Sequence, residues 1–260
     1  MDKKKILEEI TKVVRKCGDD MFSRSTSDLN ISTKTSSKDI VTDVDLYNQN
    51  RIINSITNIL PEAGFLSEEF PDGAFPENES VFIIDPIDGT MNYSKDMGHS
   101  CISVACFKDK KPYIGIVYDP YREEMFTAIL GEGAFLNGKP IKTTNQPLSN
   151  SLVLTNTASY YPELLDESIE RIHSILPKCI DIRIEGAAAL DICYVAAGRA
   201  GLYFESRISL WDYAAGALIL SEAGGELFKL DGAPITYGTE KTSIIAGSST
   251  TIRQSGLLPS

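Results

Sequence analysis

The 260-residue sequence predicts a mixed α/β fold with an N-terminal α+β half (residues 1–145) and a C-terminal α/β half (residues 146–260). Two observations favour this class. Amphipathic helical patterns near the N-terminus give way to a series of short apolar strands, and beyond residue 150 strands and helices alternate. The polar run 142–147 is too short to be a long linker. We therefore expect the halves to pack closely, with a site in the crevice between them.

Two helices are expected first. Apolar residues recur at helical spacing over residues 6–17. The Ser/Thr/Lys-rich stretch 23–39 is expected to form a surface loop. A second helix is expected over residues 45–60, where Pro61 would end it because proline cannot continue a helix.

Strands dominate the next part of the chain. The apolar run 81–84 (VFII) is typical of a strand buried on both faces, and it ends at Asp85. The meander that follows has expected strands at 101–107, 113–118 and 124–130. The expected elements of the C-terminal half are a strand from 151, helix 162–176, strand 180–184, helix 187–197, strand 201–205 and helix 212–223.

Composition narrows the possible functions. Lys and Arg number 25 against 36 Asp and Glu, for a net charge of −11. Such a surface repels phosphate backbones, so a nucleic-acid partner is not expected. The five cysteines form no C-x-x-C pair, which favours free thiols in a reducing compartment. No apolar run is long enough to cross a membrane, and we expect a cytoplasmic protein without a membrane partner.

The strongest chemical signal is the run 85–90 (DPIDGT). Asp85 and Asp88 lie three residues apart on a turn, where both carboxylates and the Ile87 carbonyl can face one hard cation. Gly89 permits the turn, and the N–H groups of Gly89 and Thr90 at a helix start suit a phosphate oxygen. Alone, this run would be interpreted as an ordinary turn, because turns commonly contain Asp and Gly.

Two further acidic sites strengthen the metal interpretation. Glu68 follows the apolar pair 65–66 at the end of an expected strand. Asp212 follows Trp211 at the start of a small-residue helix, where it could also be a purely structural N-cap. Together with Asp85 and Asp88, these residues predict a cation site.

These segments resemble the inositol monophosphatase family. Segment 85–93 (DPIDGTMNY) is similar to the family signature D-P-I/L-D-G-T-x-N-F/Y. Segment 211–225 (WDYAAGALILSEAGG) resembles the second signature, W-D-x-A-A-G followed by E-A-G-G. Segments 39–45 (DIVTDVD), 67–69 (SEE) and 186–191 (GAAALD) resemble further family elements and come in the family order. The resemblance covers most of the chain.

The resemblance implies a layered αβαβα fold of the sugar-phosphatase type with two or three Mg²⁺ ions at each site. Glu68, Asp85 and the Ile87 carbonyl would bind the first ion. Asp85 would share the second ion with Asp88 and Asp212. A third, weaker ion would lie near Glu68.

The resemblance also implies roles in catalysis and substrate binding. Thr90 and Asp45 would orient and deprotonate the attacking water, assisted by Glu68. Glu205 would bind substrate hydroxyls, and the backbone at Ala188 would touch the sugar or inositol ring. The implied substrate-binding residues are Asp88, Gly89, Thr90, Ala188, Glu205 and Asp212.

The resemblance does not single out one substrate. Glu205 favours inositol 1-phosphate, whereas fructose 1,6-bisphosphate, 3′-phosphoadenosine 5′-phosphate and histidinol phosphate are alternatives of the same reaction type. A non-catalytic binding or regulatory role is the alternative of another class. Ala187, Arg207 and Ser209 depart from commoner family patterns in the recognition region. The resemblance further implies a homodimer and inhibition by lithium.

Overall fold

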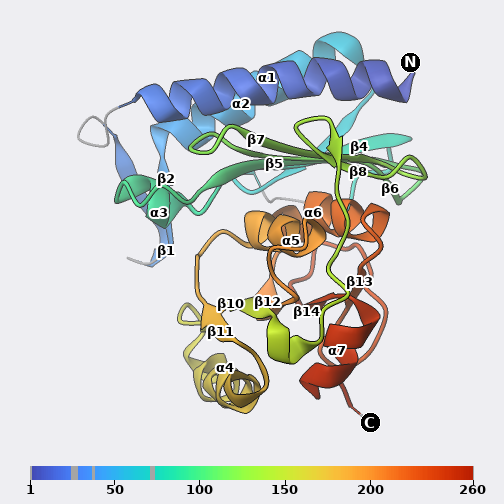
Figure 1. The fold of residues 1–260 in the computed structure, drawn as a ribbon. Helices are drawn as coiled ribbons and strands as arrows, with labels where there is room; N and C mark the ends of the chain where they lie inside the picture. Colours follow the sequence, from blue (N-terminus) through green and yellow to red (C-terminus); the bar gives the residue numbers. More distant parts are fainter. Residues whose placement is uncertain (1, 25–28, 37–38, 71–73, 260) are drawn as a thin grey trace.

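The computed structural model describes residues 2–24, 29–36, 39–70 and 74–259. Its α-helices are α1 (Lys3–Ser23), α2 (Asp43–Ile59), α3 (Thr90–Ser94), α4 (Pro162–Ile175), α5 (Ala188–Ala196), α6 (Leu210–Glu222) and α7 (Ser249–Ser255). Five layers alternate between helix and sheet (Figure 1). Helices α1 and α2 cover one face of a seven-stranded sheet, α5 and α6 separate it from a five-stranded sheet, and α4 and α7 cover the far face. The predicted layered αβαβα fold is confirmed.

The seven-stranded sheet has the strand order β3-β4-β5-β6-β7-β8-β9. Its strands are β3 (Gly64–Ser67), β4 (Ser80–Asp88), β5 (Cys101–Lys108), β6 (Lys111–Asp119), β7 (Glu124–Ile129), β8 (Ala134–Leu136) and β9 (Lys139–Pro140). β3 and β4 are parallel, and every later neighbour pairs antiparallel. This arrangement is the meander that the sequence predicts.

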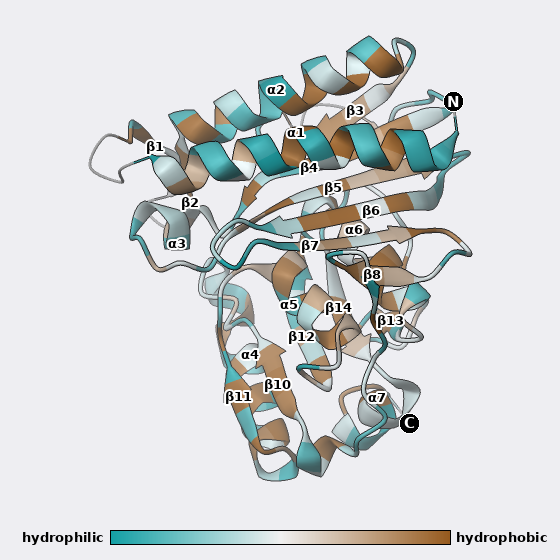
Figure 2. Cartoon of the chain, turned by 45° about the horizontal axis from the view of Figure 1, so that its top comes forward, coloured by the Kyte–Doolittle hydropathy of each residue, from teal (hydrophilic) through white to brown (hydrophobic). Residues whose placement is uncertain are grey.

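Strand β4 is buried on both faces because it is apolar on both. Phe82 and Ile84 pack with α1 and α2, whereas Val81 and Ile83 pack toward α5 and α6. Side chains alternate across a strand, so one continuous apolar run fills both cores. Figure 2 shows the complementary pattern in α1, where hydrophilic and hydrophobic residues alternate along the helix. The layer of α1 and α2 and the layer of α5 and α6 therefore pack against opposite faces of β4, the strand that carries Asp85.

The five-stranded sheet has the order β11-β10-β12-β14-β13. Its strands are β10 (Leu152–Thr155), β11 (Asp181–Arg183), β12 (Leu202–Ile208), β13 (Glu226–Phe228) and β14 (Thr242–Gly247). β10 runs parallel to both β11 and β12, and β14 pairs antiparallel with β12 and β13. Elements β13, β14 and α7 follow the last element that the sequence analysis predicted. The division at residues 145/146 stays a prediction.

The expected loop over residues 23–39 is wrong in part. β1 (Ile31–Ser36) pairs antiparallel with β2 (Asp39–Thr42), with Ile31 opposite Thr42. The polar composition of β1 hid it, because this two-stranded sheet lies outside the two large sheets and their cores. Residues 25–28 and 37–38 of the expected loop lie outside the described residues.

All five cysteines are free, and four of them are buried. Among the residues that the structure describes, no helix has both the length and the apolar character needed to span a membrane.

Candidate metal centre

A cavity of about 750 Å³ collects residues from both halves of the chain. The end of β4 and the start of α3 line it from the N-terminal half, and the ends of β12 and the start of α6 line it from the other. A site was expected in the crevice between the halves, and this cavity is lined by residues of both.

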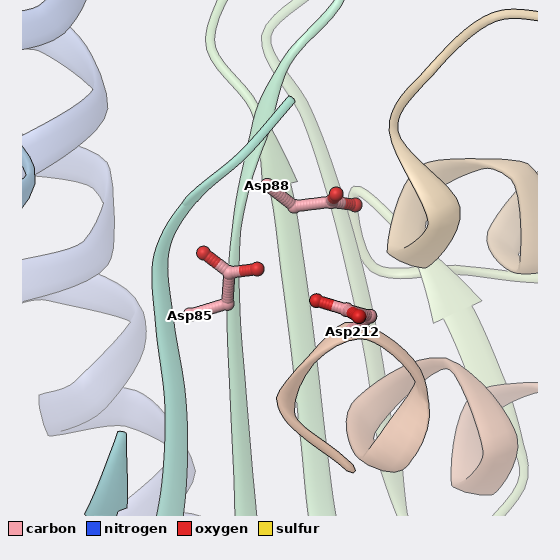
Figure 3. Close-up of side chains that lie close together, drawn as sticks. All are labelled: Asp85, Asp88 and Asp212. Carbon is pink, nitrogen blue, oxygen red and sulfur yellow. The ribbon is translucent and has the colours of Figure 1, made fainter. Parts of the chain in front are cut away.

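Three carboxylates converge in this cavity. Asp85, Asp88 and Asp212 each offer one oxygen atom, and these atoms all lie within 4.8 Å of one another. Figure 3 shows the three side chains pointing toward one another from β4 and α6. We call this group the carboxylate triad. It unites residues from the two separate signature segments.

The triad depends on an irregularity in β4. The sequence analysis expected the strand to end at Asp85, but β4 continues to Asp88. Its register with β5 shifts between these two residues. The shift interrupts the regular alternation of side chains, and both carboxylates reach the same side of the sheet.

Backbone N–H groups hold two of the triad carboxylates. The Ala189 N–H donates to Asp88 Oδ2 at 2.7 Å, and the Ile87 N–H donates to Asp85 Oδ1 at 3.0 Å. Ala189 belongs to the first turn of α5, so the C-terminal half positions an acid of the N-terminal half. Each carboxylate keeps oxygen lone pairs for another partner.

Asp212 is not the N-cap of its helix. Helix α6 begins at Leu210, Ser209 is the N-cap, and Asp212 is the third helical residue of a capping box. The Ser209 N–H donates to Asp212 Oδ2 at 2.9 Å. The backbone at Ser209, one of the three departures from the family pattern, therefore orients a triad carboxylate.

Gly89 and Thr90 form the tight turn into α3. Gly89 has φ of 86°, a left-handed conformation that costs glycine little. A Cβ there would lie 3.0 Å from the His99 carbonyl oxygen and 3.2 Å from the Cβ of Ala187. Ala187 packs beneath Gly89 and is fully buried, so this departure from the family pattern lies under the cavity wall.

Thr90 links the cavity to Asp45. Its hydroxyl lies 3.2 Å from Asp45 Oδ1 and 2.9 Å from the Ile87 carbonyl oxygen, and it can donate to one of them at a time. Asp45 itself is 0% exposed and does not line the cavity. Burial raises the pKa of Asp45 to about 6, although hydrogen bonds from Thr42 work in the opposite direction.

Glu68 lies at the cavity wall with a basic partner that sequence reasoning missed. Lys34 Nζ lies 2.9 Å from Glu68 Oε1 and 2.6 Å from Glu69 Oε1. Burial raises the pKa of Glu69 to about 7, and the Lys34 ammonium opposes that rise. Lys34 belongs to β1, in the stretch expected to be a loop, so no local pattern marked it.

The donor set suits a hard divalent cation. Burial, followed by the negative charges of neighbouring acids, raises the pKa values of Asp85 and Asp88 well above their ordinary range and that of Asp212 to about 7. No lysine or arginine forms an ion pair with the triad in the described part of the chain. These carboxylates repel one another when they are ionised, and a bound Mg²⁺ ion would stabilise their ionised forms.

The remaining predicted residues also line the cavity. Ala188 lies at the start of α5. Glu205, 8% exposed on β12, accepts a hydrogen bond from the Tyr203 hydroxyl, and burial raises its pKa to about 8. The cavity also contains Tyr161 and Lys241, which sequence reasoning missed and which no motif marks.

Glu222 of the second signature has a structural role outside the cavity. Its two carboxylate oxygens accept the Gly131 N–H at 2.8 Å and the Gly133 N–H at 2.7 Å. It therefore closes the turn between β7 and β8.

Comparison with known proteins places the chain in a family. The model of the inositol monophosphatase family matches residues 2–258. The chain belongs to this family. The resemblance stated from the signature segments is thereby confirmed.

Relatives extend over most of the chain. Inositol-1-monophosphatase of Bacillus subtilis is 32% identical over 245 residues, covering 93% of this chain and 91% of that protein. Nus factor SuhB of Pasteurella multocida is 36% identical over 202 residues, covering 77% and 76%. The family therefore includes relatives named for an enzyme and relatives named for a Nus factor.

Solved structures share the fold. The IMPase of Thermotoga maritima superposes with a TM-score of 0.85 at 31% identity, covering 97% of this chain and 95% of that one. An IMPase/NADP phosphatase in complex with Mg²⁺ and phosphate superposes with a TM-score of 0.84 at 25% identity, covering 97% and 92%.

Proposed function

We propose that this chain is a magnesium-dependent phosphatase of small phosphate monoesters, with inositol 1-phosphate as the first substrate to test. The observation that carries the proposal is the carboxylate triad beside the Thr90–Asp45 hydrogen bond. The B. subtilis relative, named an inositol monophosphatase, and the solved phosphatase complex with Mg²⁺ and phosphate support the reaction class and the metal.

Two or three Mg²⁺ ions would be held by the oxygen donors described above. Glu68, Asp85 and the Ile87 carbonyl would hold one ion. The triad, through Asp85, Asp88 and Asp212, would hold another, and a third would lie near Glu68. When bound, these cations stabilise charge on the phosphoryl oxygens and offset the repulsion between an acidic protein and its anionic substrate.

The chain itself would supply proton transfer through Thr90 and Asp45. When the Thr90 hydroxyl donates to Asp45, its lone pairs are free to accept a hydrogen bond from the attacking water. A pKa of about 6 leaves Asp45 mostly ionised at neutral pH and still basic enough to receive a proton. Thr90 would thus relay a proton from the cavity to a buried base.

Other residues that line the cavity would orient the substrate. The backbone at Gly89 and Thr90 would contact the phosphate, Ala188 the ring, and Glu205 a substrate hydroxyl. A phosphate-release survey over inositol 1-phosphate, fructose 1,6-bisphosphate, 3′-phosphoadenosine 5′-phosphate and histidinol phosphate ranks the candidates. Absence of Mg²⁺-dependent release from every one of them would reject the proposed function.

A regulatory role is the second candidate, because several relatives are named Nus factor SuhB. The complete triad favours catalysis over a purely regulatory role. Mg²⁺ binding without turnover of any phosphomonoester would reverse this preference.

We also propose that the chain forms a cytoplasmic homodimer without nucleic-acid or membrane partners. Light scattering tests the dimer. The net charge of −11 argues against a nucleic-acid partner.

A further inference from the structure

One wall of the cavity carries two positive charges arranged around a single tyrosine. Tyr161 is the residue before α4, Arg207 lies near the end of β12, and Lys241 precedes β14. All three line the same cavity as the carboxylate triad. We call them the basic rim. Three segments far apart in the sequence thus meet at one place.

Tyr161 holds both cations in position. The guanidinium carbon of Arg207 lies 4.6 Å from the centroid of the Tyr161 ring, a cation–π distance. Lys241 Nζ lies 2.5 Å from the Tyr161 hydroxyl and 5.2 Å from the ring centroid. So close to the hydroxyl, the ammonium lies at the edge of the ring, and its contact is a hydrogen bond. The ring face and its hydroxyl therefore restrain one cation each.

The basic rim retains positive charge and unused donors. Arg207 Nη1 forms an ion pair of 2.6 Å with Glu163, whose side chain is exposed. Lys241 forms no direct ion pair with a carboxylate among the residues that the structure describes, although its charge acts on Glu205 and Asp212 in the same cavity. A guanidinium carries five N–H donors and an ammonium three, so several donors remain for a ligand. One carboxylate against two cations leaves a net charge of +1.

The cavity has room for a substrate that reaches both the triad and the rim. Its volume of about 750 Å³ lies in the upper part of the range of about 300–1,000 Å³ typical of small-molecule pockets. Arginine and lysine are the side chains that proteins use to bind phosphate.

We propose that the basic rim binds a second phosphate of the substrate, so that the preferred substrate class is a small bisphosphate. This inference rests on the proposed function, in which the first phosphate lies on the triad side of the cavity. The charge of Arg207 and Lys241, held by Tyr161, selects the second phosphate. Glu205 remains available for a hydroxyl between the two phosphates.

The test compares derivatives of one sugar, fructose, that carry either one or two phosphate groups. The probes are fructose 1,6-bisphosphate, fructose 1-phosphate and fructose 6-phosphate, each assayed for phosphate release with Mg²⁺. We expect kcat/KM to be at least about tenfold higher for the bisphosphate, equivalent to about 1.4 kcal/mol. Arg207→Gln and Lys241→Gln should each lower the ratio of bisphosphate to monophosphate kcat/KM by about tenfold, and Arg207→Lys should recover part of it.

Lys139→Gln is the matched control. Lys139 is exposed on β9, at the opposite edge of the seven-stranded sheet from β3, and the same charge is removed there. It should leave the ratio unchanged. Equal kcat/KM for the mono- and bisphosphates, or equal losses for both in the rim variants, would overturn the inference while the proposed phosphatase function stands.

A binding measurement separates this inference from the proposed function. If the chain hydrolyses none of the three fructose probes, calorimetric titration of the wild-type chain with each probe in Mg²⁺ still tests the rim, while the proposed function is decided by the phosphate-release survey over the other candidate substrates. Tighter binding of the bisphosphate that weakens in Lys241→Gln supports the rim as a phosphate site. Equal affinity for all three probes overturns it.

Discussion

Replacing Asp88 with asparagine should separate metal binding from folding. The triad oxygens lie within 4.8 Å of one another. At this distance two ionised carboxylates repel by about 3.5 kcal/mol at an effective dielectric constant of 20. Burial and the Asp212 charge raise the pKa of Asp88, which favours its protonated form and reduces this repulsion. Asparagine is neutral and can still accept the Ala189 N–H. We expect the metal-free variant to be about 1–3 kcal/mol more stable than wild type at pH 8.

Calorimetry with and without Mg²⁺ measures this effect. Each kcal/mol should raise Tm by about 2–4 °C, so the metal-free variant should melt several degrees above wild type. Mg²⁺ should raise the Tm of wild type more than that of Asp88→Asn, which keeps the proposed ion site at Glu68, Asp85 and the Ile87 carbonyl but loses the triad site, and whose turnover should be abolished. Asp231→Asn, at an exposed turn residue, is the control. A lower Tm in the metal-free variant would refute the repulsion argument, and near-normal turnover would refute the metal assignment.

Three further predictions test the relay, the buried acids and the turn. Thr90→Val should lower kcat by about 10²-fold or more in the phosphate-release assay, because it removes the relay, whereas Thr90→Ser should retain most activity. Metal-free stability should fall as pH rises from about 4 to 8, because the pKa values of Asp212 and Glu205 are raised from 3.8 and 4.5 to about 7 and about 8; equal urea midpoints at pH 5 and 8 would contradict this. Glu222→Ala should cost about 1–2 kcal/mol of stability in urea unfolding and leave kcat unchanged, since it removes two acceptors at turn 131–133; a matching loss of kcat would show a role in the site.

The elements that the sequence predicted well are those with a strong local pattern. The sequence of β4 is a continuous apolar run because both faces of the strand are buried in cores. The sequence of α2 indicates a helix because one face is apolar and Thr42 caps its start. β1 lacks such a pattern. Its polar residues become a strand through backbone pairing with β2, which composition does not reveal.

The residues of the candidate site also fall into two groups, those that lie in a recognisable sequence segment and those that do not. The triad residues and Glu68 lie in signature segments, so sequence alone named them. Lys34 and Lys241 lie in segments without a motif and reach the cavity because β1 pairs with β2 and β14 pairs with β12. Their side chains meet acids or aromatic rings far away in the sequence, and no spacing rule connects such positions.

The sequence by itself determined the family, the layered fold and the acids that we propose as metal ligands. Those properties reside in short segments whose periodicity and residue types are visible locally. Only the tertiary structure decided that the acids of two signatures converge, that Asp45 reaches the cavity through Thr90, and that Lys34, Arg207 and Lys241 line the same cavity. Convergence depends on how the two sheets pack against the shared layer of α5 and α6, and this packing brings together residues from opposite ends of the chain.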